Sequence, residues 1–251
     1  MISIITGKLG GGKTLYCVGR MVEHLAKGGT IATNVDLVWQ ELVDLVKRRY
    51  RRILRPEQLM RVDLAECARW HAVIPWGVPE FPVLVVLDEI HLFFNARDWK
   101  KTEELHRDML SFLSQSRKAN IDVLFIAQVA ATLEKQFRDQ SEWEFYCRNL
   151  RDVHVPLLGR MPLNRLLLVQ RDNNSQTVAR RQIMNFDRAL FPVYDTRSFL
   201  DGQMRELAKS AKRVPPFKLQ RVPRVTTSKV VAMVVVAVVL LVRYHHLFLP
   251  R

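Results

Sequence analysis

The chain has 251 residues, of which 39 are Lys or Arg and 25 are Asp or Glu, so its formal net charge is +14 at pH 7. Hydrophobic residues make up 48% of the chain and charged residues 25%. These proportions exclude a disordered, collagen-like or multi-pass membrane protein. The length suits one α/β domain of about 200 residues with an appendage, and it excludes two large domains.

Apolar runs alternate with amphipathic stretches along the chain, which predicts strands joined by helices around a largely parallel sheet. The predicted strands are residues 2–6, 30–33, 83–87 and 123–127. The predicted helices are residues 13–27, 39–49, 102–115 and 132–138. Later strands are predicted at residues 144–148, 166–170 and 177–182. The pattern therefore indicates an α/β fold whose central strands are buried on both faces.

A glycine-rich segment follows the first predicted strand and precedes the first predicted helix. It reads Gly7-Lys8-Leu9-Gly10-Gly11-Gly12-Lys13-Thr14 and matches G-x-x-x-x-G-K-[ST] at every fixed position. In this setting the backbone N–H groups can close around phosphate at a helix N-terminus. Lys13 would reach the β- and γ-phosphates of a nucleotide, and the Thr14 hydroxyl would bind Mg²⁺. A plain flexible turn is the alternative interpretation.

Two adjacent carboxylates, Asp88 and Glu89, follow the apolar run at residues 83–87. At the carboxyl end of a buried strand, Asp88 can hold Mg²⁺ through water, and Glu89 can act as the general base for an attacking water. Acids also occur at strand ends as helix caps. The pair favours hydrolysis of a nucleotide over binding alone.

Two further polar residues flank the predicted strand at 123–127. Gln128 follows it and could sense the γ-phosphate or orient water, although it could also be an ordinary strand-end glutamine. Arg117 precedes the strand and could reach the nucleotide of a neighbouring subunit as a charge-stabilising finger, or belong to a solvated basic face. Arg97 competes with Arg117 for the finger role. His91 is interpreted as a packing residue, because no second His or Cys lies nearby to complete a metal site.

The most hydrophobic stretch is an unbroken run of 13 apolar residues at 230–242. As a helix it would reach about 20 Å, less than the roughly 30 Å hydrocarbon core of a bilayer. The flanking Lys229 and Arg243 can snorkel and extend it. The run therefore predicts a transmembrane segment, with a buried core helix or strand as the alternative.

The basic residues are distributed unevenly. Residues 205–229 hold eight basic residues and the single acid Glu206, so the rest of the chain carries +7. By the positive-inside rule, this basic segment is expected to stay in the cytoplasm, together with the part of the chain that precedes it. A second basic group consists of Lys47, Arg48, Arg49, Arg51, Arg52 and Arg55. Because juxtamembrane charge explains half of the surplus, net charge by itself is weak support for DNA binding.

Cysteine usage and the N-terminus are consistent with a cytosolic domain. Cys17, Cys67 and Cys147 are widely separated and form no C-x-x-C pair, which predicts neither a disulfide framework nor a zinc ribbon. Residues 1–6 lack the basic and apolar regions of a secretory signal and are better interpreted as the first strand.

Together these motifs resemble the zonular occludens toxin-like family, whose phage members are inner-membrane assembly proteins of filamentous bacteriophages. The resemblance rests on the loop from Gly7 to Thr14, the strand ending in Asp88 and Glu89, the Arg117 segment leading to Gln128, and the apolar run after a basic linker. It divides the chain into an NTPase domain at 1–195, a basic cytoplasmic linker at 196–229, a transmembrane segment at 230–242 and a short periplasmic tail at 243–251.

The resemblance implies a RecA/HerA-type phosphate-loop ATPase of the additional-strand, catalytic-glutamate class, with ATP and Mg²⁺ as cofactors. It implies a homo-oligomer, in the form of a ring, at the host bacterial inner membrane with the N-terminal domain in the cytoplasm. Such proteins support extrusion of single-stranded phage DNA as coat protein assembles around it. Relatives often place a sizeable periplasmic domain after the membrane segment, whereas this sequence stops at Arg251. Contact with an outer-membrane channel protein is therefore the least supported of the implied partnerships.

The leading functional hypothesis is a membrane-anchored ATPase that drives filamentous phage assembly and export. The alternative is a soluble DNA translocase or packaging ATPase whose apolar tail packs internally, in which case basic residues should line a ring channel. Here eight basic residues instead adjoin the apolar run. A toxin function, suggested only by the family's name, is discounted because relatives attach it to a far-side region that is nearly absent here.

Overall fold

The computed structural model describes residues 1–96, 103–150, 153–155, 159–161 and 164–195. All of them belong to a compact unit spanning Met1–Asp201. The predicted basic linker, the predicted transmembrane segment at 230–242 and the predicted tail lie outside the described residues. Within the described ranges, no helix has the length and apolar character needed to cross a bilayer.

The described residues form an eight-stranded sheet in the order β10-β9-β6-β1-β5-β4-β2-β3. Its strands are β1 (Ile2–Thr6), β2 (Ile31–Thr33), β3 (Leu59–Arg61), β4 (Val83–Leu87), β5 (Ile121–Ile126), β6 (Trp143–Asn149), β9 (Arg165–Asp172) and β10 (Val178–Asn185). In this spatial order, every strand between β6 and β3 runs parallel to its neighbours. Strand β9, in contrast, pairs antiparallel with both β6 and β10. The prediction of a largely parallel sheet is thus confirmed, with an antiparallel extension at one side.

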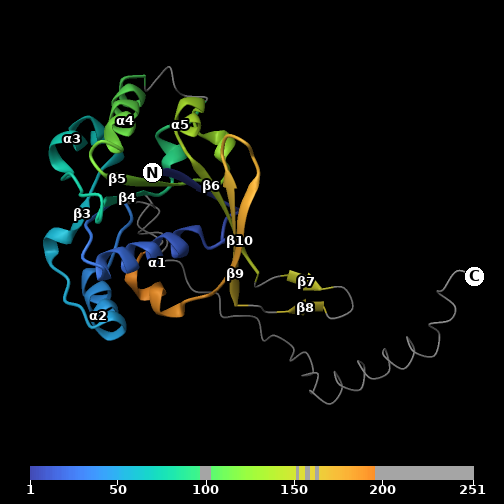
Figure 1. Ribbon diagram of the computed structural model, residues 1–251. Coiled ribbons are helices and arrows are strands. Elements are labelled where there is room, and N and C mark those ends of the chain that lie inside the picture. The colour runs from blue at the N-terminus through green and yellow to red at the C-terminus, as the bar shows by residue number, and fades with distance from the viewer. Residues whose placement is uncertain (97–102, 151–152, 156–158, 162–163, 196–251) are drawn as a thin grey trace, which may run out of the picture. The chain divides into compact units, whose positions relative to one another are not determined.

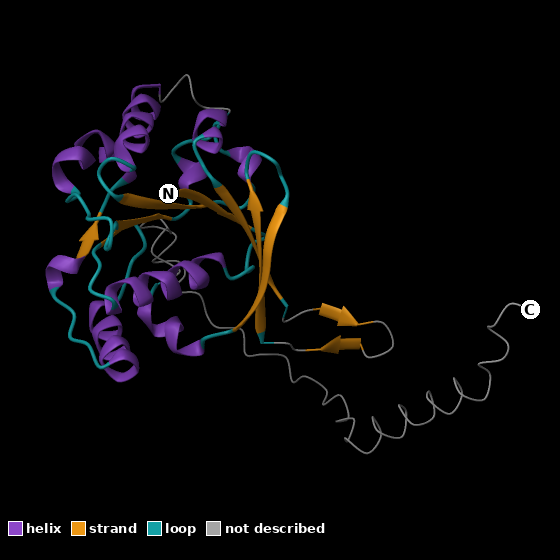
Figure 2. Cartoon of the chain, viewed as in Figure 1, coloured by secondary structure: helices purple, strands orange, loops and turns teal. Residues whose placement is uncertain are grey.

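Helices cover both faces of the sheet (Figures 1 and 2). Helices α1 (Lys13–Ala26) and α2 (Trp39–Tyr50) pack on one face, together with a 3₁₀ segment, η5 (Arg188–Val193). Helices α3 (Trp70–Val73), α4 (Glu103–Ser116) and α5 (Lys135–Asp139) contribute to the core on the other face. A small hairpin joins β7 (Val153–Val155) to β8 (Gly159–Met161). Because each face is covered, β1, β4 and most of β5 are buried and consist largely of apolar residues.

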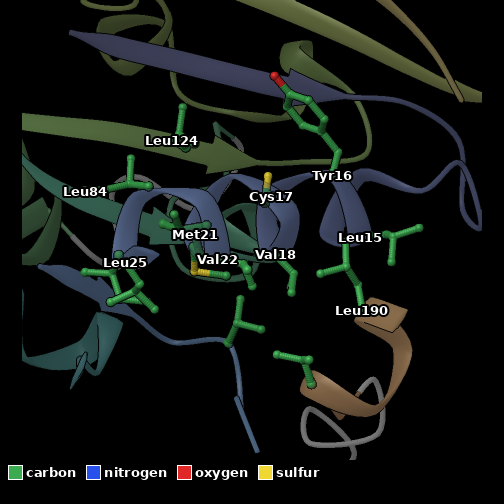
Figure 3. Packing of buried hydrophobic residues seen from close by; sticks show 14 of the residues in the cluster. Leu15, Tyr16, Cys17, Val18, Met21, Val22, Leu25, Leu84, Leu124 and Leu190 are labelled. Carbon is green, nitrogen blue, oxygen red and sulfur yellow. The ribbon is translucent and has the colours of Figure 1, made fainter. Parts of the chain in front are cut away.

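Helix α1 illustrates how the sequence pattern becomes packing. Its apolar residues Leu15, Val18 and Met21, with Val22 and Leu25, recur at helical spacing and are all buried (Figure 3). The helix ends at Ala26, where Gly28 adopts φ 96° and donates its backbone N–H to Leu25 O at 2.9 Å. The buried stripe fixes the helix against the sheet, and this fixes the position of its N-terminus at the glycine-rich loop.

The predicted strands and helices are present, with several different boundaries. The predicted strand at 123–127 instead runs from Ile121, which pairs with Val83, to Ile126. The sequence pattern missed its start because the half-exposed Asp122, which accepts from the N-terminal ammonium at 2.7 Å, interrupts the apolar run. The predicted helix at 132–138 is wrong in its first turn: α5 starts at Lys135, capped by the Glu134 side chain, which accepts from Gln136 N at 3.1 Å. The sequence pattern missed β3, α3 and the β7–β8 hairpin, which are only three or four residues long.

Candidate active site

The glycine-rich loop connects β1 to α1 at the carboxyl edge of the parallel strands. Gly7 adopts φ 147°, and a Cβ there would lie 2.2 Å from Cys147 O on the neighbouring strand β6. Gly12, at φ 87°, precedes the first residue of α1. Only glycine tolerates these two positions, because L-residues are rare at such φ values and side chains would clash. The loop therefore leads directly into the start of α1, where helix geometry favours an anion.

Lys13 is buried beneath this loop. Its ammonium donates to Gly7 O at 2.9 Å and to Lys8 O at 3.2 Å, so carbonyls of the glycine-rich loop hold the positive charge at the site. A buried cation next to a helix N-terminus makes a strongly electropositive site. The arrangement suits the phosphate chain of a nucleotide.

Asp88 and Thr14 meet across the sheet. β5 lies between β1 and β4, yet the Thr14 hydroxyl donates to Asp88 Oδ2 at 2.7 Å. Asp88 is only 5% exposed, and burial raises the pKa of its carboxyl above the ordinary value; the hydrogen bonds from Thr14 and the Glu89 backbone oppose this shift. The structure thus joins the two predicted magnesium-binding residues directly.

The donor chemistry of this pair fits Mg²⁺. Hydroxyl and carboxylate oxygens are the ligands it prefers, and it commonly takes only one or two protein groups beside water and phosphate oxygens. In the part of the chain that the structure describes, no group of three or more His, Cys, Asp or Glu residues could hold a metal by protein ligands alone. Thr14 and Asp88 are the residues that would hold it, and the bound ion would supply neutralisation of phosphate charge.

Asn34 holds the turn that carries both acids, a role the sequence reasoning missed. Its amide Nδ2 donates to Asp88 O at 2.9 Å, and its Oδ1 accepts from Asp88 N at 2.8 Å. Glu89 N donates in turn to Asp88 Oδ1 at 2.8 Å. One feature of the sequence could have identified Asn34: it is a polar residue directly after β2. In the sheet, β2 lies next to β4, the strand that precedes the two acids. Asn34 therefore positions the Asp88 backbone from the neighbouring strand.

Glu89 has the backbone conformation φ 50°, ψ 34°, which is uncommon for a residue with a side chain. Its side chain is 29% exposed, and Oε2 lies 3.3 Å from His91 Nδ1. His91, expected only to pack, therefore contacts the predicted general base. Sparsely populated backbone conformations cluster at active sites, where the surrounding structure holds them in place.

Gln128 and Arg117 lie at opposite edges of the sheet. Gln128 follows β5, its carbonyl accepts from Gly7 N at 3.2 Å, and its side chain is exposed beside the loop. Arg117 lies between α4 and β5, so it is exposed at the amino-terminal edge, away from the phosphate loop of its own chain. The structure thus brings Gln128 to the site and leaves Arg117 outside it. Arg97 lies outside the described residues.

A pocket of about 360 Å³ extends from the loop and the two acids to an aromatic wall that the sequence reasoning missed. The wall consists of Phe186, Phe191 and Tyr194, from the segment that follows β10. Burial and the nearby Asp88 carboxylate raise the pKa of Tyr194. Val38 N donates to Val193 O at 2.8 Å, which ties this segment to the start of α2. Three aromatic residues within nine positions after the last strand were the available signal.

The chain is similar to known proteins in sequence and in structure. A protein named Gene 1 protein, from Enterobacteria phage I2-2, is 29% identical over 232 residues, which cover 86% of this chain and 61% of that protein. The chain spans about three fifths of the length of the curated relatives it matches. The N-terminal domain of zonular occludens toxin from Neisseria meningitidis is 18% identical, with a TM-score of 0.47, and the match covers 77% of this chain and 98% of that one.

A further solved structure, described as an ATPase domain, has a TM-score of 0.50 at 11% identity, and the match covers 75% of this chain and 82% of that one. This likeness supports the fold: an α/β phosphate-loop NTPase with a mostly parallel sheet flanked by helices. The predicted enzyme class, a phosphate-loop NTPase, is confirmed. A family model described as zonular occludens toxin (Zot) matches residues 1–202. Since this match includes most of the chain, the protein belongs to the Zot family.

Proposed function

We propose that the chain is a magnesium-dependent ATPase that drives assembly and export of filamentous phage from the host inner membrane. It belongs to the additional-strand, catalytic-glutamate class, because β5 separates the loop-bearing strand β1 from the acid-bearing strand β4. The observation that carries the proposal is the 2.7 Å bond between Thr14 and Asp88, since it joins the phosphate site to the acid pair.

The chemistry follows from the residues already placed. The loop amides and the Lys13 ammonium bind the β- and γ-phosphates, and Lys13 exchanges its loop carbonyl partners for phosphate oxygens. Glu89 accepts a proton from the attacking water, while Gln128, at the end of β5, orients that water or contacts the γ-phosphate. Hydrogen-bond donors that are already fixed in the site stabilise the negative charge that develops on the phosphoryl oxygens. Such preorganised stabilisation is the main contribution to the rate of enzymatic phosphoryl transfer.

The proposed setting is a homo-oligomeric ring with its N-terminal domain in the cytoplasm and residues 230–242 in the inner membrane. The phage origin of the relatives named Gene 1 protein and membership of the Zot family support an export role. Single-stranded DNA and coat protein are the proposed cargo, and an outer-membrane channel protein is a further proposed partner.

The basic group at 47–55 is the proposed DNA contact. Arg49 is already engaged, since its guanidinium bonds to Asp187 Oδ2 at 2.6 Å. Lys47, Arg48, Arg51, Arg52 and Arg55 are exposed around the end of α2. These side chains are therefore available for phosphates without breaking the Arg49 pair.

A salt titration tests this contact. Replacing Arg48, Arg51 and Arg52 by Gln should weaken single-stranded DNA binding and lower the slope of log K against log salt by about 2, because each lost phosphate contact contributes about 0.7. Arg69→Gln, at the exposed end of the 3₁₀ segment η2 (Leu64–Arg69) before α3, is the matched control. An unchanged slope in the triple variant would exclude this group from DNA binding.

Two experiments test the export role. In host cells whose particle release depends on this chain, Lys13→Ala should abolish release, whereas Lys27→Ala, at the exposed end of α1, should not. A chain that ends near Thr226 should leave the membrane fraction. Release supported by Lys13→Ala would contradict the motor role, and equal membrane retention of the shortened chain would contradict anchoring by residues 230–242.

A further inference from the structure

The pocket at the phosphate loop has two chemically different ends. The loop, Lys13, Thr14 and the acid pair form a polar end, whose features are explained by triphosphate and magnesium. The aromatic wall, to which Phe186 and Phe191 belong, has no role in the phosphate chemistry. A ligand that fills the whole pocket therefore has an anionic end and a flat apolar end.

Phe186 and Phe191 face this space as a pair. Their ring centroids are 5.4 Å apart, at an interplanar angle of 40°. Phe186 is half-buried and packs against the core, whereas the Phe191 side chain is 45% exposed and lies outside the core clusters. Core packing explains Phe186 but leaves Phe191, a large aromatic residue at the rim of a pocket, without a structural role.

The segment that carries the pair is held firmly. Asp187 caps η5 by accepting from Ala189 N at 3.1 Å, and its other oxygen accepts from Arg49 on α2. Leu190 packs into the same core as Leu15 in the first turn of α1, and the two side chains face each other (Figure 3). The aromatic wall is thus fixed relative to the phosphate-binding helix terminus, and a preformed surface loses little entropy on binding.

We infer that Phe186 and Phe191 bind the base of a nucleoside triphosphate by stacking, with Phe191 as the specificity-determining residue. This inference rests on the proposed nucleotide hydrolysis at the same site. Every base offers a π-face, so an aromatic wall favours nucleoside triphosphates over inorganic polyphosphate and discriminates little between ATP and GTP.

Comparing ATP with inorganic tripolyphosphate tests the inference, because tripolyphosphate offers the phosphate chain without a base. In the full-length Phe191→Ala variant, the Kd values for ATP and GTP should both rise by about 5- to 100-fold, the range expected for one lost stacking partner. The Kd for tripolyphosphate should stay at the parent value. Phe191→Trp should restore ATP affinity, because it restores the aromatic face.

Phe81→Ala is the matched control, since Phe81 is 50% exposed before β4, at the opposite edge of the sheet. It should leave all three affinities unchanged. Parent-like ATP affinity in Phe191→Ala, or an equal loss for ATP and tripolyphosphate, would overturn the inference while leaving the proposed ATPase intact. A parent protein that binds tripolyphosphate but not ATP would overturn both.

Discussion

The Thr14 hydroxyl donates a hydrogen bond of 2.7 Å to Asp88 Oδ2, although 74 positions separate the two residues in the chain. Thr14 lies in the first turn of α1, and Asp88 follows β4, two strands away from β1. The bond depends on parallel strands whose carboxyl ends share one edge of the sheet. It therefore reports directly on whether the domain is folded as a nucleotide site.

Asp88→Asn should stabilise the nucleotide-free protein at neutral pH. Burial raises the pKa of Asp88 in the folded state, so its contribution to stability is fully present below the unfolded pKa and is lost as pH rises through the folded value. Asparagine removes the buried charge and keeps the shape. We expect a melting temperature about 2–4 °C higher at about pH 7, equivalent to roughly 1 kcal/mol.

The pH dependence separates this explanation from a general packing effect. Because the parent carboxyl becomes neutral in acid, the difference between Asp88→Asn and the parent should shrink as the pH falls through the raised pKa of Asp88 and should be small below about pH 4. Thermal unfolding at several pH values, without nucleotide and magnesium, measures it. A variant that melts below the parent at neutral pH would mean that the bonds from Thr14 and Glu89 N outweigh the cost of burial.

Glu89→Gln should separate nucleotide binding from hydrolysis. Glutamine keeps the size of the side chain but cannot accept the proton of the attacking water, so we expect hydrolysis to fall by about 10²- to 10⁴-fold. ATP affinity should remain within a few-fold of the parent. Single-turnover hydrolysis and equilibrium binding measure the two effects, with Glu80→Gln, an exposed site before β4, as the control. Parent-like turnover would assign the base to another residue.

Arg117 should act on a neighbouring subunit, because it lies at the edge of the sheet opposite its own loop. Arg117→Ala and Lys13→Ala should each be inactive alone. Mixed in one oligomer, they should recover part of the activity, since an intact loop then meets an intact arginine from the next subunit. ATPase activity across mixing ratios measures this, and a mixture no more active than its components would contradict a role in trans.

The central strands and the phosphate site were predictable because their signals are local. Buried parallel strands appear as continuous apolar runs, and the loop from Gly7 to Thr14 has a fixed spacing that its backbone geometry requires. Asp88 and Glu89 were visible as acids at the end of such a run.

The rest depends on contacts between distant segments. Asn34 matters only because β2 lies beside β4, and the aromatic wall only because η5 packs on α1, and neither contact is encoded in a local pattern. Strand β3 was missed because three half-buried or exposed residues at the sheet edge produce no apolar run. The opposite placements of Gln128 and Arg117, in contrast, follow from their positions after and before β5, because the two ends of a strand lie at opposite edges of the sheet.

The most direct measurement is steady-state ATP hydrolysis by the purified full-length chain and its Lys13→Ala variant, with and without magnesium. The parent should hydrolyse ATP only with magnesium, and Lys13→Ala should be slower by about 100-fold or more, because the buried ammonium at the loop is lost. Lys27→Ala should match the parent. Hydrolysis by Lys13→Ala at the parent rate would contradict the assignment of this loop as the catalytic phosphate site.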